Sequence, residues 1–145
     1  MAAHAETSSH ATQDSGLMRV VVVTPEQTVL DATTDFVALP LYDGELGVAS
    51  KHAPMIGRLG YGELRIGHGS GQRYYIDGGF VQVVDDVVSV LTNRAIPAAR
   101  LDEAKIKESI SYLQTQPAAG DDELVRREKA LTQTRAQLRV VQHAK

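Results

Sequence analysis

Between residues 18 and 91 the sequence alternates short apolar, β-branched runs with turn residues. The first run is Met18–Val23, and a turn signal follows about every eight to twelve residues, as in antiparallel sandwiches and barrels. Parallel strands would need crossover segments of roughly a dozen residues, and none fits between these runs. The spacing therefore predicts a β-sandwich of two packed antiparallel sheets with about ten strands.

Glycine-containing segments are expected to separate these strands. Gly60-Tyr61-Gly62 predicts a turn, and Asp77-Gly78-Gly79 predicts a turn or a bulge, because glycine adopts a positive φ without strain. Gly67-His68-Gly69-Ser70-Gly71 predicts a hairpin loop, and Asp85-Asp86 a tight connection between two strands.

After Pro97 the apolar residues recur with the period of a helix. Pro117 and Gly120 then predict an interruption, so that two helices form a hairpin. The apolar face of the first helix holds Leu101, Ala104, Ile110 and Leu113, with Ile106 at its margin, and that of the second holds Leu124, Leu131 and Leu138. We expect a disordered leader at 1–17, the sandwich at 18–96 and the hairpin at 97–145, with helices at about 101–115 and 121–143.

The composition excludes several classes of protein. The chain has no cysteine, which excludes disulfides and thiolate metal sites. No apolar stretch approaches the ~18 residues that span a bilayer, so we expect no direct membrane insertion. The expected sandwich is acidic, which disfavours nucleic-acid binding. Met18 stands at the start of the first expected strand, and initiation there is an alternative start of the protein.

The residues do not assemble a catalytic constellation. The loop at 67–71 lacks the Gly-Lys-Ser/Thr ending of a phosphate loop, and Ser70 does not fit the esterase pattern. His52 and His68 lie away from carboxylates at ligand spacing, and Asp85-Asp86 is better explained as a hairpin tip. We therefore expect no catalytic residue, metal or cofactor, and an interaction module. The alternative is a free-standing β-sandwich binding module or a hydrolase that uses the loop at 67–71.

Four motifs occur in a specific order along the chain. They are Gly44-Glu45-Leu46-Gly47 with His52-Ala53-Pro54, then Tyr75-x-x-Gly78-Gly79, then Val88-x-Val90-Leu91-Thr92, and finally Leu101-Asp102-Glu103-Ala104. With them, from about Met18 to its end, the chain resembles the epsilon subunit of F-type ATP synthases, which is called delta in mitochondria.

The resemblance implies a non-catalytic subunit of the central rotor stalk, with two five-stranded sheets and a C-terminal helical hairpin. Its implied partners are the gamma subunit, the c-ring and, transiently, the alpha and beta catalytic subunits. Such a subunit couples the c-ring to gamma during proton-driven ATP synthesis, and its hairpin inhibits ATP hydrolysis. The resemblance also implies that the protein lies peripherally on the cytoplasmic face of the bacterial inner membrane, as a part of the ATP synthase.

The resemblance also implies roles for individual residues. The c-ring contact would fall on Asp43, Gly44 and Glu45, and the gamma contact on Thr24 and His52. The inhibitory arm would use basic residues of the second helix to meet acidic groups on the catalytic subunits, namely Arg126, Arg127, Arg135 and Arg139.

Some family members bind ATP through a motif of Ile/Leu-Asp-x-x-Arg-Ala. Here Leu101 and Asp102 match, but Lys105 replaces the arginine and Ile106 the small residue. Lysine keeps the charge and loses the planar fork that holds phosphate at two points. We predict that the purified protein binds ATP weakly or not at all. Isothermal titration calorimetry with ATP checks this, and a micromolar affinity would contradict it.

Overall fold

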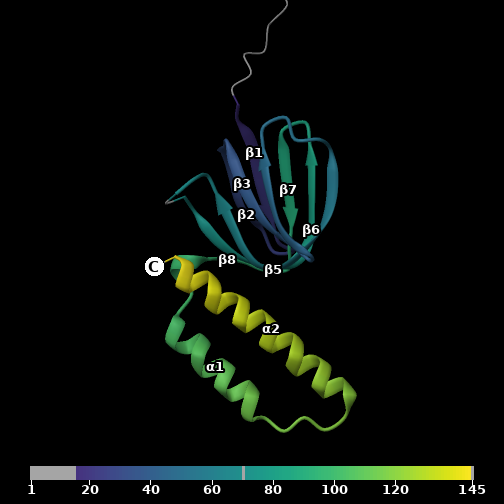
Figure 1. Ribbon diagram of the computed structural model, residues 1–145, viewed down its shortest axis with the longest axis vertical. Helices are drawn as coiled ribbons and strands as arrows, with labels where there is room; N and C mark the ends of the chain where they lie inside the picture. Colours follow the sequence, from purple (N-terminus) through teal and green to yellow (C-terminus); the bar gives the residue numbers. More distant parts are fainter. Residues whose placement is uncertain (1–15, 70, 145) are drawn as a thin grey trace, which may run out of the picture.

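The computed structural model describes residues 16–69 and 71–144 (Figure 1). The expected leader at 1–17 thus lies almost entirely outside the described residues. Eight strands are followed by a short 3-10 helix and two α-helices. They are β1 Met18–Val23, β2 Thr28–Thr34, β3 Phe36–Leu41, β4 Gly44–Ala49, β5 Met55–Ile66, β6 Arg73–Val84, β7 Val87–Leu91, β8 Ala95–Pro97, η1 Ala98–Arg100, α1 Glu103–Thr115 and α2 Asp121–His143.

The strands form one continuous hydrogen-bonded path in the order β2-β1-β7-β6-β5-β3-β4, and β8 pairs with β6. The pairs are antiparallel, with the exception of β1 and β7, which run parallel. The prediction of purely antiparallel sheets is wrong for this pair. The argument from missing helical crossovers failed here because strands β2 to β6 themselves form the connection between the two parallel strands.

Strands β5 and β6 each contribute to both layers of the sandwich. One part of β6 pairs with β7 and the other with β8, and β3 pairs mainly with the later part of β5. Eight strands therefore supply ten strand segments, in the layers β2-β1-β7-β6-β5 and β8-β6-β5-β3-β4. This confirms the predicted sandwich of about ten strands.

The two long strands bend at glycines. In β6 the core-facing side chains include Ile76 before the bend and Val81 after it, so the alternation changes phase at Gly78-Gly79. Gly79 has a φ of 105°, and a Cβ atom there would lie 1.9 Å from the carbonyl oxygen of Leu91. This position therefore requires glycine.

The facing strand passes through the segment that was predicted to be a turn. Gly60-Tyr61-Gly62 lies inside β5, and a Cβ atom on Gly60 would lie 2.8 Å from the carbonyl oxygen of Leu41. The prediction of a turn there is wrong, because these glycines permit close approach of β3 to a continuous, bent strand.

Between the layers lies an aliphatic core rich in valine. Its fully buried members include Val20, Val22, Val81, Val88 and Val90. β-branched side chains pack well on a pleated surface and lose little rotamer freedom there, which explains how a chain with no Trp and two Phe fills a sandwich.

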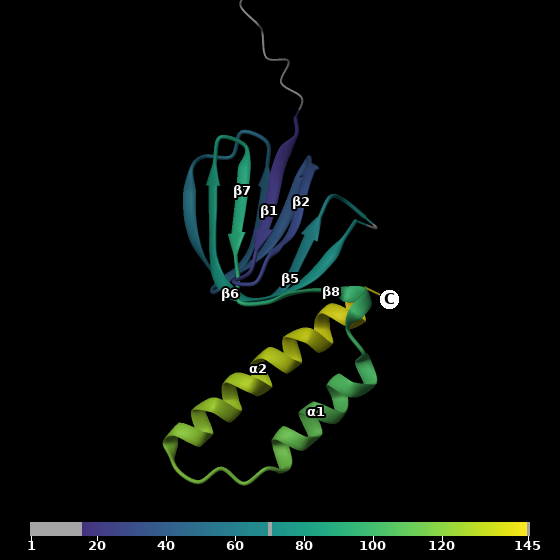
Figure 2. The same ribbon diagram turned by 180° about the vertical axis from the view of Figure 1, so that it is seen from behind.

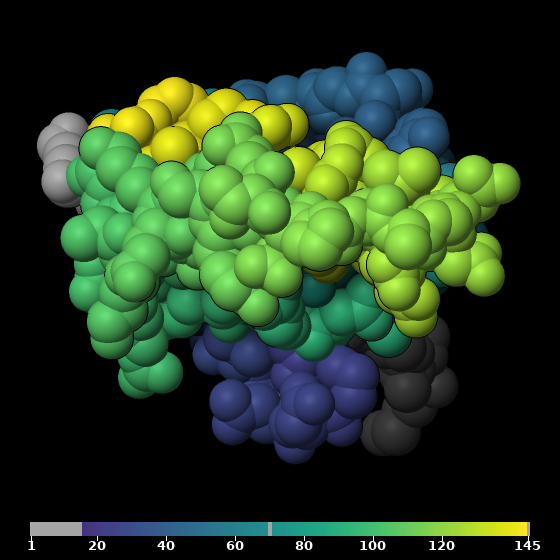
Figure 3. Space-filling view, turned by 90° about the horizontal axis from the view of Figure 1, so that it is seen from below, coloured from purple at the N-terminus to yellow at the C-terminus, as the bar shows by residue number. Residues whose placement is uncertain are grey.

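The helical pair lies across one end of the sandwich, and both ribbon views agree on this arrangement (Figures 1 and 2). Helix α2 packs on β5 and β6, whereas α1 packs on α2. Viewed from the helical side, the two helices cover much of that end, and the N-terminal strands protrude beyond them (Figure 3). A second apolar cluster, formed around Tyr75, Ala98, Ala136 and Val140, joins α2 to the sandwich.

Helix α1 begins later than predicted, because Asp102 is its N-cap. The Asp102 carboxylate accepts hydrogen bonds from the amides of Ala104 at 3.0 Å and Lys105 at 3.3 Å. The predicted apolar face is also wrong in part. Ala104 is exposed, and Ile106 is the buried residue of the helix. With the helix starting at Glu103, the side facing α2 passes through Ile106 and Ile110 instead.

We predict that Gly79→Ala destabilises the protein by about 3 kcal/mol, because the added methyl group meets a backbone carbonyl and the φ is unfavourable. Urea unfolding measures the change. The matched control is Gly69→Ala, where φ is +67° and no atom lies within 4 Å of the added carbon. That change should cost about 1–2 kcal/mol. Equal costs for the two substitutions would show that the steric limit at Gly79 is absent.

Candidate interaction surface

Four large apolar side chains lie exposed on the outer face of β5, β6 and β7 and at the adjoining end of β3. The exposed fractions are 70% for Tyr42, 77% for Ile56, 59% for Phe80 and 53% for Leu91. We call these four residues the apolar stripe. Clustered exposed apolar residues on a soluble domain mark interaction sites, whereas single ones need no explanation.

The strand register makes the stripe continuous. Phe80 pairs with Leu91 on one side and with Arg58 on the other. The Arg58 guanidinium lies 4.4 Å from the centre of the Tyr42 ring, a cation–π contact that extends the stripe to the β3–β4 turn. Ile56 lies two residues from Arg58 on the same face of β5.

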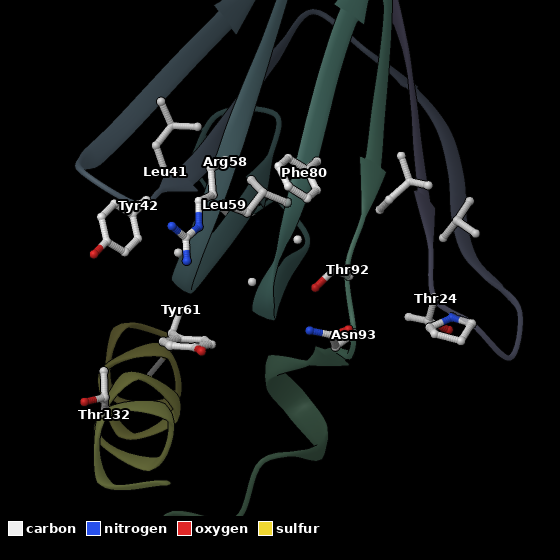
Figure 4. A pocket seen from close by; sticks show the side chains of 16 residues that line it. Thr24, Leu41, Tyr42, Arg58, Leu59, Tyr61, Phe80, Thr92, Asn93 and Thr132 are labelled. Atoms are coloured by element: carbon white, nitrogen blue, oxygen red, sulfur yellow. The ribbon is translucent and has the colours of Figure 1, made fainter. Parts of the chain in front are cut away.

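A groove of about 1010 Å³ adjoins the stripe. Figure 4 shows Thr132 of α2 on one side, Thr24 on the other, and Phe80 and Arg58 between them. The floor is the glycine bend of β5 and β6. The groove is therefore bounded by the sandwich, the β1–β2 turn and the arm, by which we mean the hairpin of α1 and α2.

The residues predicted to meet the c-ring lie together on the β3–β4 hairpin. Asp43 is in the turn, and Gly44 and Glu45 begin β4; all three are exposed. The Glu45 carboxylate accepts a hydrogen bond of 2.9 Å from Arg65 on β5. This pair fixes one side of the turn, while Asp43 stays accessible.

The two residues predicted to meet gamma are not brought together. Thr24 is 8% exposed at the end of β1, where its hydroxyl donates to the Gln27 carbonyl at 3.2 Å. His52 lies near the opposite end of that strand, since the neighbouring Lys51 amide donates to Asp86 at 2.6 Å and the Asp86 carbonyl accepts from Arg19. A partner touching both would have to span the length of β1.

The four arginines of the predicted inhibitory arm occupy different sides of α2. Arg135 and Arg139 are exposed and one turn apart, whereas Arg126 is exposed about half a turn round the axis from Arg135. Arg127 is half-buried and donates to the Gln116 carbonyl at 2.9 Å. Arg127 therefore holds the loop between the helices.

The degenerate ATP motif lies where η1 meets α1. Leu101 packs against the cluster around Tyr75, the Asp102 carboxylate caps the helix, and Lys105 is exposed. These residues line a hollow of about 460 Å³ between α1, α2 and β8, which also contains Arg94 and Arg100.

The glycine-rich loop carries one contact that spacing did not reveal. His68 stacks on Phe36 with 4.8 Å between ring centres, and its Nε2 lies 3.7 Å from the Asp35 carboxylate. The expectation that His68 lies apart from any carboxylate is wrong, because the start of β3 runs beside the hairpin. Ser70 lies outside the described residues. Within 16–69 and 71–144, no cluster of His, Asp and Glu is placed to hold a metal ion.

Sequence reasoning missed a buried polar cluster beneath α2. The Asp77 carboxylate is joined to Tyr75 and Arg94, and Asp77 is 5% exposed. Burial and the neighbouring carboxylate raise the pKa of Tyr75 well above its ordinary value. Burial works against the charge of Arg94, but its hydrogen bond to Asp77 prevails and raises the pKa of the guanidinium. The only signal in the sequence was an aspartate directly after the apolar run Tyr74-Tyr75-Ile76.

The chain was then compared with known proteins. The family model of the ATP synthase delta/epsilon chain β-sandwich domain matches residues 17–98. An ATP synthase epsilon chain of Rhodopirellula baltica is 51% identical over 123 residues, which cover 84% of this chain and 96% of the relative. This chain belongs to the ATP synthase delta/epsilon family. An epsilon chain of a Janthinobacterium species is 40% identical over 95 residues, covering 63% of this chain and 68% of the relative.

Chains in solved structures of ATP synthases share the fold at low identity. A chain of the Euglena gracilis mitochondrial ATP synthase superposes with a TM-score of 0.75 at 21% identity and covers 83% of this chain and 79% of its own length. A chain of the Tetrahymena thermophila central stalk and c-ring structure gives 0.61 at 17%, with coverages of 86% and 96%. Family membership confirms the resemblance: the chain is an epsilon-type, non-catalytic stalk subunit.

Proposed function

We propose that this protein links the c-ring to the gamma subunit in the central stalk during proton-driven ATP synthesis, and that its arm restrains ATP hydrolysis. Family membership supports the place in the complex. The observation that carries the proposal is the apolar stripe, which presents Ile56, Phe80 and Leu91 on a rigid sheet face. Torque transfer needs a stiff body with a large contact, and a sandwich with a close-packed core provides one.

The proposed contacts divide the surface of the sandwich. The apolar stripe and the groove beside Thr24 bind gamma, whose docking extends along β1 toward His52. The β3–β4 turn, with Asp43, Gly44 and Glu45, meets the c-ring. The exposed Arg126, Arg135 and Arg139 meet the alpha and beta catalytic subunits transiently when the arm is away from the sandwich.

The proposed location follows from these partners. Among the described residues, no helix is long and apolar enough to cross a membrane. We place the protein peripherally on the cytoplasmic face of a bacterial inner membrane, held there by the other subunits.

We predict that the double substitution Phe80→Ser with Leu91→Ser weakens binding to gamma by at least 100-fold. Each side chain loses roughly 1.5–3 kcal/mol of burial at the contact. Titration calorimetry with purified gamma measures the affinity. Both positions are exposed, so the free protein should keep its fold, which circular dichroism verifies.

The matched control is Val125→Ser, which removes an equally exposed apolar side chain from the arm. Its affinity for gamma should stay within twofold of the wild type. If the stripe variant binds gamma as tightly as the control does, gamma docks elsewhere.

A second experiment tests the arm. We predict that replacing Arg126, Arg135 and Arg139 with Gln raises ATP hydrolysis by the assembled synthase severalfold, because the charged two-point bonds to carboxylates are lost. Arg127 is kept, since it holds the loop between the helices. Steady-state hydrolysis assays measure the rate.

The same three positions replaced with Lys provide the control for charge alone. Inhibition that survives in the Lys variant but not in the Gln variant shows that charge suffices, whereas its loss in both shows that the planar fork is needed. An unchanged rate in the Gln variant would refute a brake that acts through these residues.

A further inference from the structure

A buried carboxylate lies at the place where the arm meets the sandwich. Asp77 is 5% exposed and stands on β6 directly before the glycine bend. A charge in such a place is costly unless several donors surround it. The donors present are the Tyr75 hydroxyl at 2.7 Å, Arg94 Nε at 3.1 Å and Gln133 Nε2 at 2.9 Å.

The last of these donors comes from the arm. Gln133 lies on α2, 56 residues further along the chain than Asp77. Gln137, one turn further on, lies beside Tyr75 and acts against the rise in the pKa of its hydroxyl. Two glutamines one helical turn apart thus meet two residues on the same face of β6, with the fully buried Ala136 between them.

The polar contacts supply what the apolar part of the joint does not. Ala136 and Val140 pack against Tyr75, but apolar contact is non-directional, so such small side chains alone would allow α2 to slide. A slide by one turn moves Gln133 about 5.4 Å, beyond the reach of Asp77. A slide in one direction would bring Gln137 to Asp77, but it would also move Gln137 away from Tyr75. The two glutamines together therefore favour one register of the helix on the sheet.

Asp77 is in turn fixed by its own strand and its neighbours. Its amide donates to the Thr92 hydroxyl at 3.2 Å and to the Arg94 carbonyl at 3.1 Å. Its carbonyl accepts from Asn93 at 3.2 Å. The carboxylate is thus held in place by the β7–β8 connection, whatever the position of the arm.

We propose that Asp77 is the positioning residue of the arm: its carboxylate, preset by Tyr75 and Arg94, binds Gln133 and determines where and how firmly α2 docks on the sandwich. The consequence for ATP hydrolysis rests on the proposed function, because a firmly docked arm is withheld from the catalytic subunits. The docking itself does not depend on that function.

The experiment first removes and then exchanges the hydrogen-bond donor and acceptor of the Asp77–Gln133 pair. Because the chain has no cysteine, spin labels can be placed at Ser111→Cys on α1 and Gln82→Cys on β6, both at exposed positions. Pulsed electron paramagnetic resonance on the full chain then measures the distance between the two spin labels, which differs between the docked and the undocked arm. Gln133→Glu sets a carboxylate against Asp77, and we expect at least a tenfold rise in the ratio of undocked to docked protein.

Adding Asp77→Asn to Gln133→Glu should restore the docked distance, because the new amide donates to the new carboxylate. A merely structural role for Asp77 would not produce this rescue. Gln133→Ala should shift the same ratio in the same direction and tests the pair should Gln133→Glu not fold. The control Gln114→Ala, on the exposed side of α1, should leave the distances unchanged.

The outcomes separate the two proposals. Unchanged distances in the folded Gln133 variants, or no rescue by Asp77→Asn, would overturn the role of Asp77. If the distances shift and are rescued as expected, Asp77 positions the arm. ATP hydrolysis by synthase assembled with the same variants then tests the proposed function: a shift in the arm without any change in rate would show that the arm is no brake.

Discussion

The steric limit at Gly79 is the constraint on which the rest of the structure depends. Its α-carbon lies so close to the Leu91 carbonyl that no side chain fits there, and its φ suits glycine alone. The bend allows β6 to leave one layer and enter the other, and β5 bends beside it at Gly60. A single hydrogen-bonded sheet thereby folds over into a sandwich around its valine core.

The same bend divides the outer surface of β6 into two regions. Before the glycines, Tyr75 and Asp77 face α2 and are buried by it. After the glycines, Phe80 and Gln82 face outward and are exposed. Strand β6 thus contributes both to the surface on which α2 packs and to the apolar stripe. The change of phase explains how two functions lie next to each other on a small domain.

The sequence predicted what depends on local pattern. Strand periodicity and turn residues gave the sandwich, and the acidic start at Asp121 and the seven-residue leucine repeat gave the second helix. The parallel pairing of β1 with β7 could not be predicted, because it joins segments far apart in the chain. Likewise, the sequence around Gly60 is equally typical of a turn and of a bent strand. What requires glycine there is the close approach of the Leu41 carbonyl, which lies on another strand.

In the candidate site, too, the features that depend on local sequence could be predicted, whereas those that depend on contacts between distant segments could not. Exposure of Phe80 and Leu91 depends on which face of the sheet the core occupies after the bend, which periodicity alone does not settle. Asp77 finds its partners at Arg94 and Gln133, on other elements, so that the cluster exists only once the chain has folded. Residue types along the sequence gave the positions of the arm arginines, whereas their orientation round α2 required knowledge of which side packs on β5 and β6.

The parallel contact of β1 and β7 has a consequence for biosynthesis. Arg19 is aligned with Val87, so β1 pairs with β7 only after most of the sandwich has been synthesised. Before that, one edge of β1 lacks its backbone hydrogen bonds. Until then the β1–β2 hairpin presents an open row of amide and carbonyl groups, the kind of edge that recruits strands from other chains. Such non-local closure slows folding and gives nascent chains a period of vulnerability to aggregation.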